Sequence, residues 1–196
     1  VSTLQKFIKG ISSGKIRNFS LNNYKFEEEI DKNGAIADVL SPNQSVLIQI
    51  VKEPISTKGP RVTSELSIAG RFLVLVPFSN RISISQKIEN QKEKDRLKRL
   101  VKSITPKGFG VIVRTVAKGK KVAELDRDLQ NLYNRWIAMC KKIRNANIPS
   151  KVMDEMNISS KILRDLFDES FTSILVHDGA LHIQIKDYVQ KIAPKK

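Results

Sequence analysis

Alternating hydrophobic and polar positions predict several strands in the first half of the chain. The segment SVLIQIVKE (45–53) alternates and is rich in Val and Ile, as half-buried strands are. Two further strands are expected in RVTSELSI (61–68) and RFLVLVP (71–77), which Ala69-Gly70 separates. Together these segments predict a β-rich unit over about residues 45–88.

The residues before this unit, 1–44, combine a short amphipathic start with the run FEEEIDKNG and several Asn, Ser and Gly residues. Residues of these types favour turns and loops because they populate non-helical backbone conformations easily. We therefore expect residues 1–44 to be mostly loop, with one or two helical turns.

Helical periodicity replaces the alternation from Asn90. A stripe with the spacing i, i+3, i+4, i+7 predicts a helix over 90–103: Leu97, Leu100, Val101 and Ile104. Lysines four apart would lie on another face of this helix: Lys94, Lys98 and Lys102. A short buried strand, GVIVRT (110–115), and a long helix over about 122–146 are expected next.

The last zone predicts a helix, a strand and a helix, in SSKILRDLFDES (159–170), SILVH (173–177) and GALHIQIKDYVQKIA (179–193). The chain thus begins with strands and continues with helices between single strands. This order predicts the α+β fold class.

Positive charge is concentrated in one stretch. The 196 residues contain 35 Lys and Arg against 20 Asp and Glu, a net charge of +15. Residues 81–121 hold thirteen of the basic and three of the acidic side chains, or +10, against +3 for residues 1–80 and +2 for residues 122–196. This excess argues against an ordinary acidic enzyme and favours a polyanionic partner. A phosphate-contacting surface and a merely solvated lysine-rich helix face both fit the concentration.

Cysteine content and hydropathy bear on the compartment. Cys140 stands alone, so no internal disulfide is expected, and a reducing, cytoplasmic setting fits best. No apolar run approaches the roughly 18 residues that cross a bilayer, so no membrane association is expected. Because the chain begins at Val1, we expect a piece of a longer polypeptide.

Few side chains are arranged for catalysis or metal binding. His177 and His182 lie five residues apart without a Cys or a third His nearby, so we expect surface or capping roles and no metal site. No Gly-rich P-loop, G-x-S-x-G or H-E-x-x-H motif is found, and no catalytic residue is assigned. Acidic residues of the predicted helix 159–170 are expected to pair with its own Lys161 and Arg164: Asp165, Asp168 and Glu169.

Residues suited to phosphate binding follow the predicted strand 110–115. Arg114 can donate a bidentate pair, Thr115 can donate one hydroxyl bond, and the glycine of the loop AKGKK allows backbone N–H groups to approach. An Arg at a strand end is otherwise most often a partner in a surface salt bridge. Lys58-Gly59, with Arg61 beside it, is either a contact with a nucleic-acid backbone or an ordinary turn.

Three blocks carry a resemblance to a known family: VKEPISTKGPRVTSELSIAGRFLVLVP (51–77), ISQKI (84–88) and GFGVIVRT (108–115). In this order and spacing they strongly resemble the RNase E/RNase G family of bacterial endoribonucleases, in particular the RNase G type, from about residue 37 to residue 196. In that family an RNA-binding OB-type barrel is followed by a subdomain that holds the 5′-monophosphate of the RNA. A deoxyribonuclease-like domain further along binds the catalytic magnesium, and a cysteine pair after it binds zinc.

The resemblance implies how the chain is divided. Residues 1–67 would form part of the OB-type barrel, largely loop up to residue 44, and residues 68–121 a mixed α/β 5′-sensor subdomain. Residues 122–196 would form a helical and α/β segment, ending in helix, strand and helix, that leads to the catalytic region. Barrel strands before Val1, catalytic aspartates and zinc ligands are expected outside the chain. No cofactor is therefore expected here, whereas magnesium and structural zinc are expected in the full-length protein. A homo-oligomer could form through regions that lie partly outside this chain.

Matching positions imply roles for residues near the predicted phosphate site. Arg114 and Thr115 match the pair that grips the 5′-phosphate. Gly70 and Val74 match positions whose backbone and small side chain shape the pocket beside that phosphate.

Further positions imply contacts with the RNA chain. Lys58 matches a barrel residue associated with RNA contact, and Arg61 and Lys87 are predicted to bind RNA as well. The family often has two adjacent arginines where this chain has Gln86 and Lys87. Lys87 keeps the charge without the planar fork, so the second phosphate clamp is weakened.

We therefore predict the RNA-binding, 5′-monophosphate-sensing part of a bacterial ribonuclease G that acts in rRNA maturation and mRNA turnover, with single-stranded RNA as its partner. The alternative is a basic, ribosome- or rRNA-associated protein that binds RNA without sensing an end. Binding by such a protein would weaken steeply with salt and ignore end chemistry. A complete enzyme in these residues would require magnesium-dependent cleavage, for which no carboxylate cluster is found.

Overall fold

The computed structural model describes residues 2–22, 24–25, 34–35, 37, 40–154, 158–167 and 170–192. The chain forms two compact units, Val1–Val152 and Met153–Lys196. Both helices and sheets are present, which confirms the α+β class. The boundaries expected at residues 67 and 121 stay predictions.

The first unit contains a four-stranded sheet. Its strands lie in the order β3 (Ile68–Ala69), β4 (Leu73–Pro77), β6 (Phe109–Val113) and β5 (Ile82–Ile84). Strand β4 is antiparallel to β3 and β6, whereas β5 and β6 are parallel because α2 (Gln91–Ile104) connects them. A short 3₁₀ helix, η2 (Thr115–Ala117), and the long helix α3 (Val122–Arg144) follow β6.

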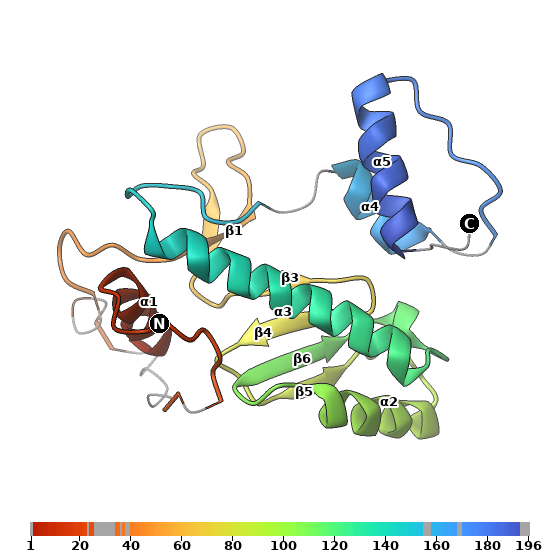
Figure 1. The fold of residues 1–196 in the computed structure, drawn as a ribbon, viewed down its shortest axis with the longest axis horizontal. Coiled ribbons are helices and arrows are strands. Elements are labelled where there is room, and N and C mark those ends of the chain that lie inside the picture. Colours follow the sequence, from red (N-terminus) through yellow and green to blue (C-terminus); the bar gives the residue numbers. More distant parts are fainter. Residues whose placement is uncertain are drawn as a thin grey trace. The chain divides into compact units, whose positions relative to one another are not determined.

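Helices cover one face of this sheet. Helix α3 packs against β3 and β4, and α2 packs against β5 and α3 (Figure 1). The covered face holds fully buried side chains of the two central strands: Leu73, Leu75, Val111 and Val113. On the opposite face Val74 pairs with Ile112, whose side chain is 44% exposed, so this face is open. The predicted apolar stripe of α2 is confirmed at Leu97 and Val101, which are fully buried, and Leu129 of α3 is fully buried as well.

The N-terminal segment is more helical than predicted. Helix α1 (Ser2–Ser12) runs for 11 residues, so the expectation of one or two turns is wrong. Leu4, Phe7 and Ile11 are buried, and the Phe7 ring stacks on Trp136 of α3 with centroids 5.7 Å apart. This packing against a distant helix stabilises a segment whose local composition favours loop. Residues 26–33, in the acidic run, lie outside the described residues.

The β-rich region is shorter and more divided than predicted. Strand β1 (Gln49–Lys52) pairs with β2 (Arg61–Thr63) in a separate two-stranded sheet, and the described residues contain no closed barrel. A single strand over 61–68 is therefore wrong, since its two ends belong to different sheets. The Gln49 side-chain amide bonds the backbone N–H and C=O of Ser67, which takes Ser67 out of the strand ladder. Strand β5 lies inside the predicted β-rich unit, at a place where no individual strand is predicted.

The second unit consists of α4 (Ile158–Leu166) and α5 (Gly179–Ile192), which share a small core. The predicted strand 173–177 is wrong, because residues 171–178 are irregular. Ile174 and Val176 pack against the buried side chains of Leu163, Phe167 and Ile185. These two apolar side chains are therefore buried against helices. No strand in the described part of this unit offers backbone hydrogen bonds to residues 173–177. In place of the predicted helix, strand and helix, the described residues form two helices, and residues 171–178 between them are irregular.

Candidate functional site

One carboxylate of α3 holds the backbone between β3 and β4. Asp128 Oδ1 accepts a hydrogen bond from the backbone N–H of Arg71 at 3.2 Å. Its Oδ2 accepts from Phe72 and Leu73 at 2.8 and 3.0 Å. Gly70 is required by this close approach, because a Cβ there would lie 2.7 Å from Oδ2. We call residues 70–73 the clamped turn.

Burial dominates the protonation equilibrium of Asp128. It raises the pKa of this carboxyl above the ordinary value of 3.8. The bonds from the three backbone N–H groups, and then the positive charge of Arg114, act in the opposite direction and lower the pKa. These donors therefore offset part of the free-energy cost of placing a charge inside the fold.

Arg114 holds the same turn from its carbonyl side. Its backbone N–H donates to the Phe72 carbonyl at 2.8 Å, and its Nη1 donates to the Gly70 carbonyl at 2.9 Å. The N–H groups of residues 71–73 thus bond to Asp128, while the carbonyl groups of Gly70 and Phe72 bond to Arg114. The Gly70 N–H donates to the Leu73 carbonyl and closes the turn itself. This arrangement fixes the direction of a half-exposed guanidinium group at the end of β6.

Thr115 follows Arg114 at the start of η2, and its side chain is exposed. The Thr115 hydroxyl lies 2.9 Å from the hydroxyl of Ser85, the residue that follows β5. Two hydroxyl groups and one guanidinium group therefore come from the ends of β5 and β6. Groups of this kind bind phosphate oxygens as hydrogen-bond donors.

The structure brings together only some of the predicted site residues. Arg114 contacts Gly70, and Val74 lies on the open face of β4 next to the clamped turn. Lys87 is exposed in the turn after β5, two residues beyond Ser85.

The other predicted RNA contacts lie in the two-stranded sheet. Lys58 is exposed in a tight turn, where its backbone exchanges hydrogen bonds with Ile55. Arg61 is exposed at the start of β2. The roles of all these residues stay predictions.

The loop after η2 differs from its predicted use. Gly119 has a positive φ of 74°, and its N–H donates to the Glu93 carboxylate at 2.8 Å. The backbone group that was expected to approach phosphate is therefore already bonded. Hydrogen bonds from Arg96, and then from Gly119, lower the pKa of Glu93 to about 2. Arg96 also donates to the Lys120 carbonyl, so α2 holds this loop in place.

Sequence reasoning missed three residues at the site. Asp128 has no motif signal, since it is one of several acidic residues of α3. Ser85 stands inside the block ISQKI, without a pattern that indicates its contact with Thr115. Phe72 carries two cations near its ring face, Arg71 at 5.4 Å and Lys120 at 5.6 Å from the centroid.

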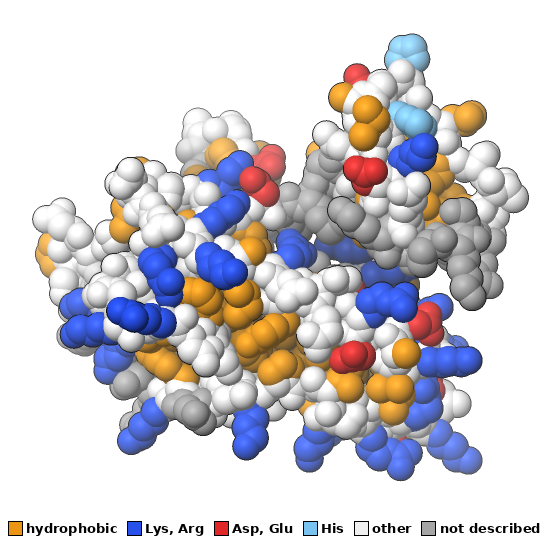
Figure 2. All heavy atoms as spheres, in the orientation of Figure 1, with side chains coloured by type: hydrophobic (Ala, Val, Ile, Leu, Met, Phe, Trp, Pro, Cys, Tyr) orange, Lys and Arg blue, Asp and Glu red, His pale blue; other side chains and the backbone are white. Residues whose placement is uncertain are grey.

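Positive side chains gather over α2. Figure 2 shows Lys and Arg side chains crowded at the lower right, where α2 lies in Figure 1. The predicted lysine face is confirmed at Lys98 and Lys102, which are exposed, while Leu97 and Val101 are buried on the other side. Helix α2 contains six of the thirteen basic side chains of 81–121 and two of its three acidic ones, so part of the dense positive charge lies on this helix.

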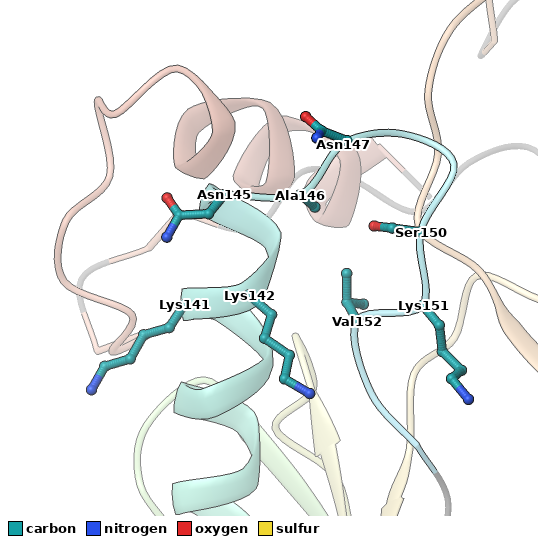
Figure 3. A pocket seen from close by; sticks show the side chains of 8 residues that line it. All are labelled: Lys141, Lys142, Asn145, Ala146, Asn147, Ser150, Lys151 and Val152. Carbon is teal, nitrogen blue, oxygen red and sulfur yellow. The ribbon is translucent and has the colours of Figure 1, made fainter.

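A second basic region lies at the C-terminal end of α3. An open hollow of about 620 Å³ is lined by the last turn of α3 and the loop after it (Figure 3). Its lining contains three exposed lysines and no acidic side chain: Lys141, Lys142, Asn145, Ala146, Asn147, Ser150, Lys151 and Val152. The side chains of Lys142 and Lys151 extend to the same side (Figure 3). We call this region the basic hollow.

The described residues offer little to a metal ion. No group of three or more His, Cys, Asp and Glu side chains in the described ranges is placed to hold one. His177 and His182 are exposed, and Asp165 pairs with Arg164 at 2.9 Å as predicted. Asp168 and Glu169 lie outside the described residues. No described helix is long and apolar enough to cross a bilayer.

The model of the Ribonuclease E/G family matches residues 67–196, which include the clamped turn, Arg114 and Thr115. The chain belongs to this family. Ribonuclease E of Nostoc sp. is 33% identical over 156 residues, which cover 80% of this chain and 23% of that protein. Ribonuclease G of Haemophilus influenzae is 28% identical over 169 residues, which cover 86% of this chain and 34% of that protein. A Ribonuclease E/G-like protein of Pyropia yezoensis is 30% identical over 195 residues, which cover 95% of this chain and 38% of that protein.

Membership of the Ribonuclease E/G family confirms the predicted resemblance. The chain spans 23% of the length of the Nostoc relative and 38% of the Pyropia relative. Relatives named Ribonuclease E and Ribonuclease G both match, so the G type stays a prediction. The predicted magnesium and zinc of a longer protein stay predictions as well.

Proposed function

We propose that this chain is an RNA-recognition part of a ribonuclease E/G protein and that Arg114 and Thr115 bind the 5′-monophosphate of single-stranded RNA. One observation carries the proposal: Arg114 Nη1 bonds to the Gly70 carbonyl at 2.9 Å, which fixes the guanidinium at the end of β6, the strand that Thr115 follows. A donor set held by backbone groups binds phosphate with little loss of side-chain entropy.

In this proposal the rest of the basic surface attracts the RNA backbone. The exposed lysines of α2 supply attraction that does not depend on sequence or end chemistry. The hairpin of β1 and β2, with Lys58 and Arg61, belongs to the OB-type part and follows the nucleotides further along. Lys87 contributes a second, monodentate phosphate contact.

Cleavage belongs to the longer protein. Family resemblance assigns hydrolysis to a magnesium-binding domain further along and zinc to a cysteine pair, and this chain supplies recognition of RNAs that carry a monophosphate. A triphosphate end is rejected because the clamped turn lies against the guanidinium group. The protein is proposed to act in the cytoplasm, with a homo-oligomer formed partly through regions outside this chain.

Binding of RNA oligonucleotides with different 5′ ends tests the proposal. The same single-stranded sequence, labelled at its 3′ end, would carry a 5′-monophosphate, 5′-hydroxyl or 5′-triphosphate. We expect the monophosphate to bind about tenfold more tightly than the hydroxyl end, the scale of a charge-assisted pair. Arg114→Gln should bring this ratio close to one.

Arg99→Gln is the matched control, since Arg99 is exposed on α2 and its loss changes the net charge equally. This variant should weaken binding of both ends alike and leave the ratio unchanged. Equal affinities of the wild-type chain for phosphate and hydroxyl ends would refute end sensing. They would leave the alternative of a basic RNA-binding protein that ignores the end.

A further inference from the structure

Ser85 is joined to Thr115 across two strand ends. The Ser85 backbone N–H donates to the Val113 carbonyl at 2.9 Å, which continues the pairing of β5 with β6. Its side-chain hydroxyl lies 2.9 Å from the Thr115 hydroxyl, although the two residues are 30 positions apart. The backbone bond places Ser85, so the side-chain contact does not depend on a flexible loop.

Each hydroxyl group has one hydrogen and two acceptor lone pairs. In the pair, one hydroxyl donates to the other, and one hydrogen remains for a further acceptor. The structure gives neither hydroxyl another side-chain partner among the described residues, and Thr115 is exposed. The remaining hydrogen is therefore available to a ligand that only accepts, and a phosphate oxygen is such a ligand.

We propose that Ser85 is a positioning residue that donates its hydroxyl hydrogen to Thr115 and thereby directs the Thr115 hydrogen toward the 5′-phosphate. This inference rests on the proposed function. When Ser85 donates, the Thr115 oxygen accepts and its own hydrogen points away from Ser85. The Thr115 hydroxyl is then oriented before RNA arrives, and binding does not have to order it.

Five variants test the role of Ser85 through the ratio of affinities for 5′-phosphate and 5′-hydroxyl RNA. Ser85→Ala should lower this ratio about threefold, the scale of one neutral hydrogen bond. Ser85→Thr keeps a hydroxyl and should retain the ratio. Ser83→Ala is the matched control on β5, with no effect expected. In the background of Thr115→Val, Ser85→Ala should cause no further loss, because Ser85 acts through Thr115.

Two results would overturn the positioning role while the proposed function stands. An unchanged ratio in Ser85→Ala, with a lowered urea midpoint, would mean that the bond only ties β5 to η2. A lower affinity ratio in the double variant than in Thr115→Val would mean that Ser85 binds phosphate by itself. A ratio of one in the wild-type chain would instead refute the proposed function, and this result is obtained before any variant is compared.

Discussion

The clamped turn with Arg114 and the basic hollow are both positively charged, but they are built differently. At the clamped turn, the guanidinium group is bonded to a backbone carbonyl, and the opposite side of the turn is bonded to Asp128. In the basic hollow, the charges sit at the ends of exposed lysine side chains around an open space. The first region presents donors that backbone groups hold in fixed directions, whereas the second presents charges on long side chains at the surface.

This difference separates recognition from attraction. A fixed, planar donor group distinguishes a terminal phosphate from a hydroxyl, because its N–H groups bind one arrangement of oxygen atoms more tightly than others. Flexible lysines attract any phosphodiester and are screened by salt. Net charge along the chain does not separate the two, since residues 122–196 carry only +2 yet contain the basic hollow.

The largest effect is expected from removing the carboxylate that holds the clamped turn. Asp128→Ala leaves three backbone N–H groups without their acceptor, so the free energy of unfolding should fall by about 3 kcal/mol. Urea denaturation measures this change. Asp126→Ala is the control on the same helix and should change the free energy by less than about 0.5 kcal/mol. Equal effects of the two variants would show that the turn does not depend on Asp128.

A smaller effect is expected from the basic hollow, and it should fall on RNA affinity alone. Replacing its three lysines by Gln should weaken both 5′-phosphate and 5′-hydroxyl RNA equally. The slope of log affinity against log salt should become shallower by up to about 2, since each phosphate contact with a single strand contributes about 0.7. A charge-matched variant at three exposed lysines near α1 serves as control: Lys6, Lys9 and Lys15. A changed end preference in the hollow variant would contradict the separation of the two regions.

The smallest effect concerns acid stability near the loop beside the clamped turn. The folded-state pKa of Glu93, about 2, lies below its ordinary value of 4.5. Its ionised form therefore stabilises the fold above pH 4.5, and this contribution is lost as the pH falls toward 2. Asp128 has the opposite effect on the pH dependence of stability. Its pKa is raised in the folded state, so acidification stabilises the fold through this group.

Urea midpoints at about pH 6 and about pH 3 measure the contribution of Glu93. The wild-type chain should lose more stability on acidification than Glu93→Gln, with Glu89→Gln as the exposed control. Identical pH dependence in wild type and Glu93→Gln would contradict the role of the bonds to Arg96 and Gly119.

Helical segments were predictable because their signal is local. The stripe containing Leu97 and Val101 predicts α2 within one residue at each end, and both side chains are fully buried as expected. Strands were less predictable because they need partners. Residues 173–177 alternate like a strand, but Ile174 and Val176 find their apolar neighbours on α4 and α5. Helix α1 was underestimated because Phe7 is stabilised by Trp136, far along the chain.

Of the candidate site, the sequence supplied Arg114 and Thr115 from their chemistry and Gly70 and Val74 from family resemblance. It did not indicate Asp128, whose bond to Arg71 joins residues 57 positions apart, or the contact of Ser85 with Thr115. It also did not indicate that the Gly119 N–H donates to the Glu93 carboxylate.

Local patterns in the amino-acid sequence therefore account for the α+β class, the long helices, the family and the concentration of charge in 81–121. Each of these depends on periodicity, residue order or charge, which are properties of residues close together in the chain. Folding alone decides that Asp128 and Arg114 hold opposite sides of one turn and that two hydroxyls meet at 2.9 Å. These contacts arise where β4, β5, β6 and α3 converge, and their free energy depends on burial and distance between segments that no short pattern relates.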